Sequence, residues 1–231
     1  MTFRNHMKLR LAILGWAMLL GLQAAWMILP DMLAHRNASG ASGDAAKGGR
    51  AAAELGARLG LVRGDLWADV ALSYSELAWP PGRSISDAAA GGELDVARAA
   101  ARRALEGSPH DARLWLLLAA LDVQRERLLH QHSKETVDAL KMAYYTAPND
   151  RRFSSHRLMI AARSGVSADQ ELRPLVGNEI RLVLTRWPEL KPAVVAAYEE
   201  ASPAARTLFE DSVRVEDPKL LEAARPASGA R

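Results

Sequence analysis

The chain has 231 residues, of which 49% are hydrophobic and only 6% aromatic, and it contains no cysteine. The absence of cysteine excludes disulfides, thiolate metal sites and cysteine nucleophiles. The formal net charge of +3 comes from Arg4, Lys8 and Arg10, which precede an apolar segment, so residues 31–231 are formally neutral. Nucleic-acid-binding proteins usually carry a basic stripe on their folded part, so we expect no nucleic-acid partner.

An apolar run lies near the start of the chain. Residues 11–29 carry no charge, and as a helix they would extend about 28 Å, close to the hydrocarbon thickness of a bilayer. We therefore predict a transmembrane helix there. Because Lys and Arg precede it, we expect residues 1–10 in the cytoplasm and the bulk of the chain in the periplasm, across a bacterial inner membrane. The alternative is a cleaved secretory signal, although this apolar run is longer than a usual signal core.

Small residues recur along this segment. Ala17, Gly21 and Ala25 are spaced every four residues, which places them on one helix face and would allow close pairing with a second copy. A homodimer through this helix is one expectation. The alternative is an unpaired anchor, because such spacing also arises by chance in alanine-rich spans.

The rest of the chain favours helices joined by short connections. Residues 30–49 are rich in Gly, Ser and Ala and predict a flexible linker. Beyond them alanine, leucine and arginine dominate, and alternating β-branched runs are absent, so we expect an all-α fold. We place helical hairpins over residues 50–163, capping helices over residues 164–224 and a disordered tail over residues 225–231.

Small residues and prolines recur at fixed intervals in the hairpin region. Small residues let two antiparallel helices approach closely, and proline stops the second helix before the next unit begins. The pattern resembles the tetratricopeptide repeat, Trp-x2-Leu-Gly-x2-Tyr followed by Ala-x3-Phe-x2-Ala-x4-Pro. The resemblance rests on Trp67, Val70, Ala71, Tyr74, Ala97, Ala101, Ala104 and Pro109 in the first unit, and on Trp115, Leu118, Ala119, Leu140, Ala143 and Pro148 in the second.

The chain departs from that pattern in several places. Asp122 stands where the family has tyrosine, and residues 79–92 fit an inserted loop in the first unit. The third unit is weak. We expect its first helix over residues 153–163, then a capping box of Ser167 with Gln170, with Pro174 causing a kink or a late start. Further helices are expected over residues 189–201, 203–214 and 218–224.

The resemblance also implies a binding groove, because the first helices of tetratricopeptide units line a concave face. Counting the family's groove positions from Gly64, Ala112 and Arg151 gives an apolar middle with arginines toward the C-terminal end. Such a groove suits a peptide with apolar and some acidic side chains. The alternative is that these residues pack inside a closed bundle. The expected groove residues are Leu72, Arg113, Leu116, Ala120, Gln124, Arg152, Ser155, Met159 and Arg163.

No motif in the sequence indicates catalysis. A phosphate-binding loop, a nucleophile elbow and a zinc-protease helix are all missing. His130 and His132 are the only close histidines, and side chains two residues apart on a helix face different ways. We therefore expect no catalytic residue, no metal site and no cofactor.

These patterns favour a non-enzymatic, membrane-anchored scaffold that binds an envelope protein or peptide. By analogy with anchored repeat proteins, we favour a role in polysaccharide polymerisation or export. A chaperone subunit of cytochrome maturation is the alternative within this class. A carbohydrate-handling enzyme on an α-hairpin scaffold is the alternative from another class, and it would require two desolvated carboxyl groups facing each other.

Overall fold

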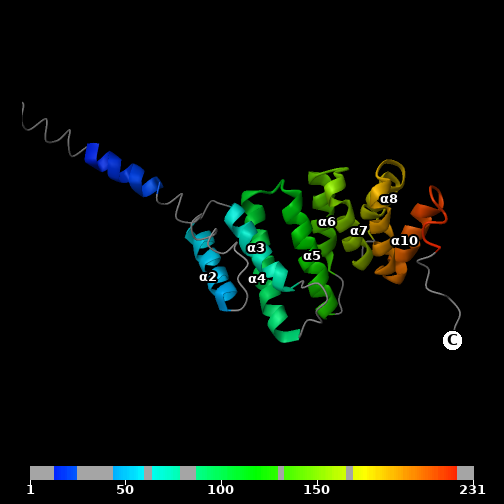
Figure 1. Cartoon of the computed structure of the whole chain (residues 1–231), viewed down its shortest axis with the longest axis horizontal. Helices are drawn as coiled ribbons and strands as arrows, with labels where there is room; N and C mark the ends of the chain where they lie inside the picture. Colours follow the sequence, from blue (N-terminus) through cyan, green and yellow to red (C-terminus); the bar gives the residue numbers. More distant parts are fainter. Residues whose placement is uncertain are drawn as a thin grey trace, which may run out of the picture.

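The computed structural model of the chain describes residues 13–24, 44–59, 64–78, 87–129, 133–164 and 169–222. Within these ranges the backbone forms helices and no strand, which confirms the predicted all-α class. The helices lie side by side in an elongated row (Figure 1). They are α2 (Asp44–Leu59), α3 (Gly64–Ala78), α4 (Asp87–Gly107), α5 (Ala112–Leu129), α6 (Lys134–Thr146), α7 (Arg151–Arg163), α8 (Leu172–Arg186), the 3-10 helix η2 (Pro188–Leu190), α9 (Lys191–Glu199) and α10 (Pro203–Arg214).

Two helical hairpins form the centre of the row. Helix α3 packs against α4, and α5 packs against α6. Ala97, Ala101 and Ala104 on α4 have no exposed surface, so the backbones of α3 and α4 can approach closely. Gly64 has the same role at the start of α3, where an added Cβ would lie 2.8 Å from the carbonyl oxygen of Ala104. The predicted packing of hairpins through small side chains is therefore present.

The remaining helices continue this stacking. Helix α7 contacts both α5 and α9, and α8 contacts α10. One cluster of buried apolar side chains runs through the stack, from Ala57 on α2 to Leu221 beyond α10. The core is thus continuous along the row.

Side-chain caps mark several of the helix starts. The side chains of Ser133, Asp150 and Ser202 each accept a hydrogen bond from a backbone N–H in the first turn of α6, α7 and α10. These bonds satisfy donors that have no partner inside the helix. Pro203 occupies the first turn of α10, and that helix has the predicted bounds.

Three helices begin earlier than expected, and α7 does so by only two residues, at Arg151. Helix α4 starts at Asp87, inside the predicted loop over residues 79–92, and α2 starts at Asp44, inside the predicted linker. Gly91 and Gly92 therefore lie within α4. Glycine lowers helix propensity by about 1 kcal/mol but does not block a helix as proline does. Treating these glycines as loop residues was wrong for that reason.

The C-terminal predictions are partly correct. Helix α8 starts late, at Leu172, with Pro174 in its first turn. The carboxylate of Asp169 accepts the backbone N–H groups of Glu171 and Leu172 at 3.0 and 2.9 Å, while Ser167 lies outside the described residues. The predicted helix over residues 218–224 is wrong in the part that the structure describes, because residues 218–222 form turns.

The apolar N-terminal segment is described from residue 13 to residue 24, where it is helical and every side chain is exposed. Large apolar side chains such as Trp16 and Met18 are 68% and 75% exposed. No helix among the described residues is both long and apolar enough to cross a membrane. The predicted span over residues 11–29 extends beyond the described segment at both ends, and Ala25 lies outside it.

Candidate protein-binding face

Three first helices of the stack lie next to one another. Helix α5 contacts both α3 and α7. These helices begin at Gly64, Ala112 and Arg151, the residues from which the groove positions were counted. We use the name first-helix face for the positions on α3, α5 and α7 that carry Leu72, Ala120, Gln124, Ser155 and Met159.

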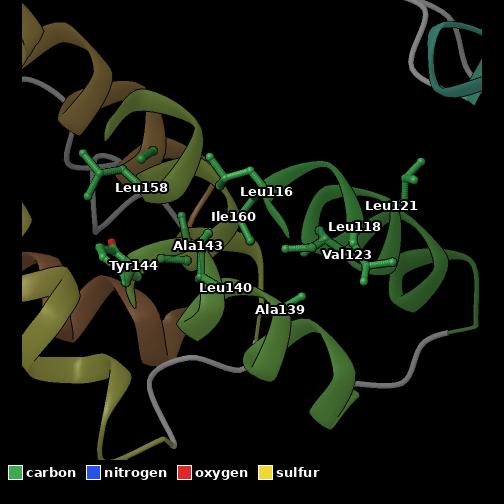
Figure 2. Close-up of a cluster of buried hydrophobic side chains, with 14 of the residues drawn as sticks. Leu116, Leu118, Leu121, Val123, Ala139, Leu140, Ala143, Tyr144, Leu158 and Ile160 are labelled. Carbon is green, nitrogen blue, oxygen red and sulfur yellow. The ribbon is translucent and has the colours of Figure 1, made fainter. Parts of the chain in front are cut away.

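The residues of the first-helix face remain partly accessible. Leu72 is 50% exposed, and the other four are partly buried. Leu116, also expected in the groove, is only 6% exposed. Figure 2 shows its side chain beside Ile160 in the buried apolar cluster. Leu116 therefore contributes to the core between α5 and α7.

The two expected arginines at the start of α5 and α7 have matching surroundings. Arg113 and Arg152 are each 77% exposed and form ion pairs with Asp111 and Asp150, at 3.0 and 2.6 Å. Each aspartate also accepts the backbone N–H of the same arginine. Hydrogen bonds from Arg152 lower the pKa of Asp150 to about 2. An aspartate therefore balances each arginine's charge locally.

The third expected arginine contacts the C-terminal part of the chain. The Arg163 side chain is 16% exposed, and its guanidinium lies 3.4 Å from the carboxylate of Glu200, which follows α9. This end of the first-helix face is thus adjacent to α9, in agreement with the packing of α7 against that helix.

A charged network lies fully inside the protein where α6, α7 and α8 meet. Arg157 on α7 and Glu179 on α8 form an ion pair at 3.4 Å, with side chains 0% and 4% exposed. The hydroxyl groups of Tyr144 and Ser154 donate to the same carboxylate at 2.5 and 2.9 Å. Burial raises the pKa of Glu179, and the three donors around it oppose that shift.

Arg157 also binds the end of α6. Its Nη2 donates to the carbonyl oxygens of Ala143 and Ala147 at 2.6 and 2.7 Å. These carbonyls lack helical partners or carry the negative end of the helix dipole, so a buried cation stabilises them. The guanidinium also lies 4.6 Å from the ring centroid of Tyr144. This single side chain therefore connects three helices.

A second buried carboxyl group lies between α4 and α5. Asp122, which stands at the family's tyrosine position, is 1% exposed and pairs with the guanidinium of Arg98. Burial raises the pKa of Asp122. The Arg98–Asp122 pair connects α4 with α5, whereas the Arg157–Glu179 pair connects α7 with α8.

Sequence reasoning missed the Arg157–Glu179 network, although an internal repeat points toward it. The sequence Pro-x-Asp-x-Arg occurs at Pro109 and again 39 residues later at Pro148. At the same offset, Arg157 and Glu179 correspond to Leu118 and Leu140, both of which are buried and apolar. Charged residues at two positions that are apolar and buried in the preceding unit could therefore have indicated a buried ion pair.

The described part of the chain contains no group of three histidine, aspartate or glutamate side chains placed to hold a metal ion. His130 and His132 lie outside the described residues. No protein-family profile matches the sequence, and no characterised protein or solved structure matches it either. In the part of the chain that the structure describes, the fold is that of an all-α protein built of packed helical hairpins.

Proposed function

We propose that this protein is a non-enzymatic scaffold anchored in the bacterial inner membrane, which binds an envelope protein or peptide on the first-helix face. The observation that supports the proposal is the contact of α5 with both α3 and α7, which brings these three helices next to one another. Binding surfaces of this kind are typical of stacked helical repeats. The tetratricopeptide resemblance of the sequence supports the same assignment.

The chemistry of the face indicates the type of ligand. Ala120, Ser155 and Met159 are small or apolar, uncharged and partly buried. An apolar side of an extended or helical peptide suits such a surface. Methionine adapts to differently shaped ligands because its side chain is unbranched and flexible.

The N-terminal segment supplies the proposed anchor. Seven large apolar side chains between residues 13 and 24, including Ile13 and Leu22, are 55–75% exposed. Exposed apolar surface on this scale is typical of contact with lipid or another protein. The basic residues before this segment favour a cytoplasmic N-terminus and a periplasmic array.

Photo-cross-linking in intact cells tests the binding face. A photoreactive residue at Ser155 or Met159 should capture the same envelope protein from both positions. The matched controls are Arg103 on α4 and Lys134 on α6, which are exposed on second helices and should not capture it. Capture from the controls at equal yield, or no capture from the face, would show that partners do not bind there.

A membrane-extraction experiment tests the anchor separately. The wild-type chain should stay with membranes after an alkaline wash, and a C-terminal reporter should be active only outside the cytoplasm. Leu19→Arg places a charge within the apolar segment, at a cost of about 3 kcal/mol for insertion, and should release part of the protein. Leu55→Arg, at a site 53% exposed on α2, is the control. Equal release of both variants would contradict the anchor.

A further inference from the structure

Five ion pairs among the described residues connect α6 and α7 to residues 169–222, which we call the C-terminal unit. In every pair the base belongs to α6 or α7 and the acid to the C-terminal unit. Figure 1 shows the helices of this unit, α8 and α10, at the end of the row beside α6 and α7. The pairs are Lys141–Asp169, Lys141–Glu171, Arg151–Glu189, Arg157–Glu179 and Arg163–Glu200.

Most of these bases are shielded from water. The side chains of Arg157, Arg163 and Lys141 are 0%, 16% and 17% exposed, and only Arg151 is mainly exposed. Their partners Glu171, Glu189 and Glu200 are instead 65%, 56% and 50% exposed, so salt can screen these three pairs. The fully buried Arg157–Glu179 pair is screened much less. Hydrogen bonds to Glu171 and Asp169 raise the pKa of Lys141, so this cation stays charged throughout the neutral range.

The joint between α4 and α5 has a different distribution of charge signs. There Arg98 on α4 pairs with Asp122 on α5, while Arg125 on α5 lies 3.5 Å from Asp95 on α4. Charges of both signs occur on each side, so neither surface carries one sign only. The joint before the C-terminal unit is instead polarised, with a basic surface facing an acidic one. Such charge complementarity fixes how two surfaces dock and makes their association depend on salt.

We propose that this polarised joint is a conformational device: the C-terminal unit opens as one cooperative segment while α3–α6 stay folded, and ionic strength controls the opening. Apolar side chains of the unit, such as Val176 and Ile180, lie in the common core and keep it closed at low salt. Opening uncovers Lys141, Arg157 and Arg163 together. The inference goes beyond the proposed function and does not depend on it.

Hydrogen exchange of the full-length chain in detergent, read by mass spectrometry, tests the proposal. Raising salt from about 0.05 M to about 0.5 M shortens the screening length several-fold, and amides of α8–α10 should exchange at least threefold faster. Amides of α3–α6 should keep their rates. Arg163→Glu should accelerate exchange in α8–α10 about tenfold, since it places like charges together, and the swap Arg163→Glu with Glu200→Arg should restore most of the difference.

Arg103→Glu is the matched control, because Arg103 pairs with Glu106 within α4 at 3.0 Å, far in sequence from the joint. It should leave the exchange of α8–α10 unchanged. Lys141→Gln, which removes two pairs at once, serves as the second variant if Arg163→Glu does not fold. Salt-independent exchange of α8–α10, or acceleration spread equally over α3–α6, would overturn the proposal. The proposal would also be overturned if amides of α8–α10 exchanged as fast in the charge swap as in Arg163→Glu alone.

Discussion

Arg157 on α7 and Glu179 on α8 form an ion pair at 3.4 Å in which neither side chain is more than 4% exposed. Removing two charges from water costs several kcal/mol per ion, and their attraction offsets this only when further hydrogen bonds complete the site. Ser154, Ala143 and Ala147 supply such bonds. The pair is thus held by groups from three helices, and its geometry depends on their arrangement.

Breaking this pair from one side should be costly. Arg157→Leu leaves Glu179 buried without its cation, and Glu179→Leu leaves Arg157 without its anion, so each should lower the free energy of unfolding by about 3–5 kcal/mol. The double variant reproduces the apolar Leu118 and Leu140 of the preceding unit and should lie within about 2 kcal/mol of the wild type. Denaturant titration followed by circular dichroism measures all three. If the double variant lost as much free energy of unfolding as the two single variants combined, the pairing would be contradicted.

Close approach of α3 and α4 should make Gly64 intolerant of a side chain. An added Cβ would lie 2.8 Å from the carbonyl oxygen of Ala104, so Gly64→Ala should lower stability by about 1–3 kcal/mol through overpacking. Gly92→Ala is the matched control, because its Cβ would meet nothing within 4 Å inside α4. That variant should gain about 0.5–1 kcal/mol from helix propensity. Thermal unfolding measures the stability of both variants. Equal changes in stability would contradict the close contact at Gly64.

The cap of α7 should make stability depend on acid pH. Folding lowers the pKa of Asp150 from 3.8 to about 2, chiefly through the side-chain hydrogen bonds of Arg152. The contribution of this carboxylate is therefore complete above about pH 4 and is lost as the pH falls through about 2. Asp150→Ala should cost about 1 kcal/mol at pH 7, and its difference from the wild type should shrink toward pH 2. Asp111→Ala should behave alike, since bonds from Arg113 lower the pKa of Asp111.

Denaturant titrations at pH 7 and near pH 2.5 measure this dependence. The control is Arg152→Ala, which keeps the hydrogen bond from the backbone to Asp150 but removes the guanidinium that lowers its pKa. It should lose stability at a higher pH than the wild type. A constant difference between Asp150→Ala and the wild type at both pH values would contradict the assigned cap.

Features set by neighbouring residues were predictable. Ser202 followed by Pro203 predicted the start of α10, and the small residues of α4 predicted its close packing, because capping and backbone approach depend on residue types at short spacing. Glycine was a poor predictor of a loop, because Gly91 and Gly92 lie inside α4, a helix that tertiary packing stabilises. Of the residues expected in the groove, Ala120 and Met159 are partly buried, whereas Leu116 lies in the core, and the groove itself stays a prediction.

By itself the sequence determined the all-α class, the hairpin packing through small side chains and several helix starts, because each depends on propensities and spacings within a few turns of chain. Only the tertiary structure decided which distant charges meet. Arg157 with Glu179 and Arg163 with Glu200 are separated by more than five helical turns of sequence, and their pairing follows from how α7, α8 and α9 stack. Burial in that stack gives these charges energies that the same residues would not have on an isolated helix.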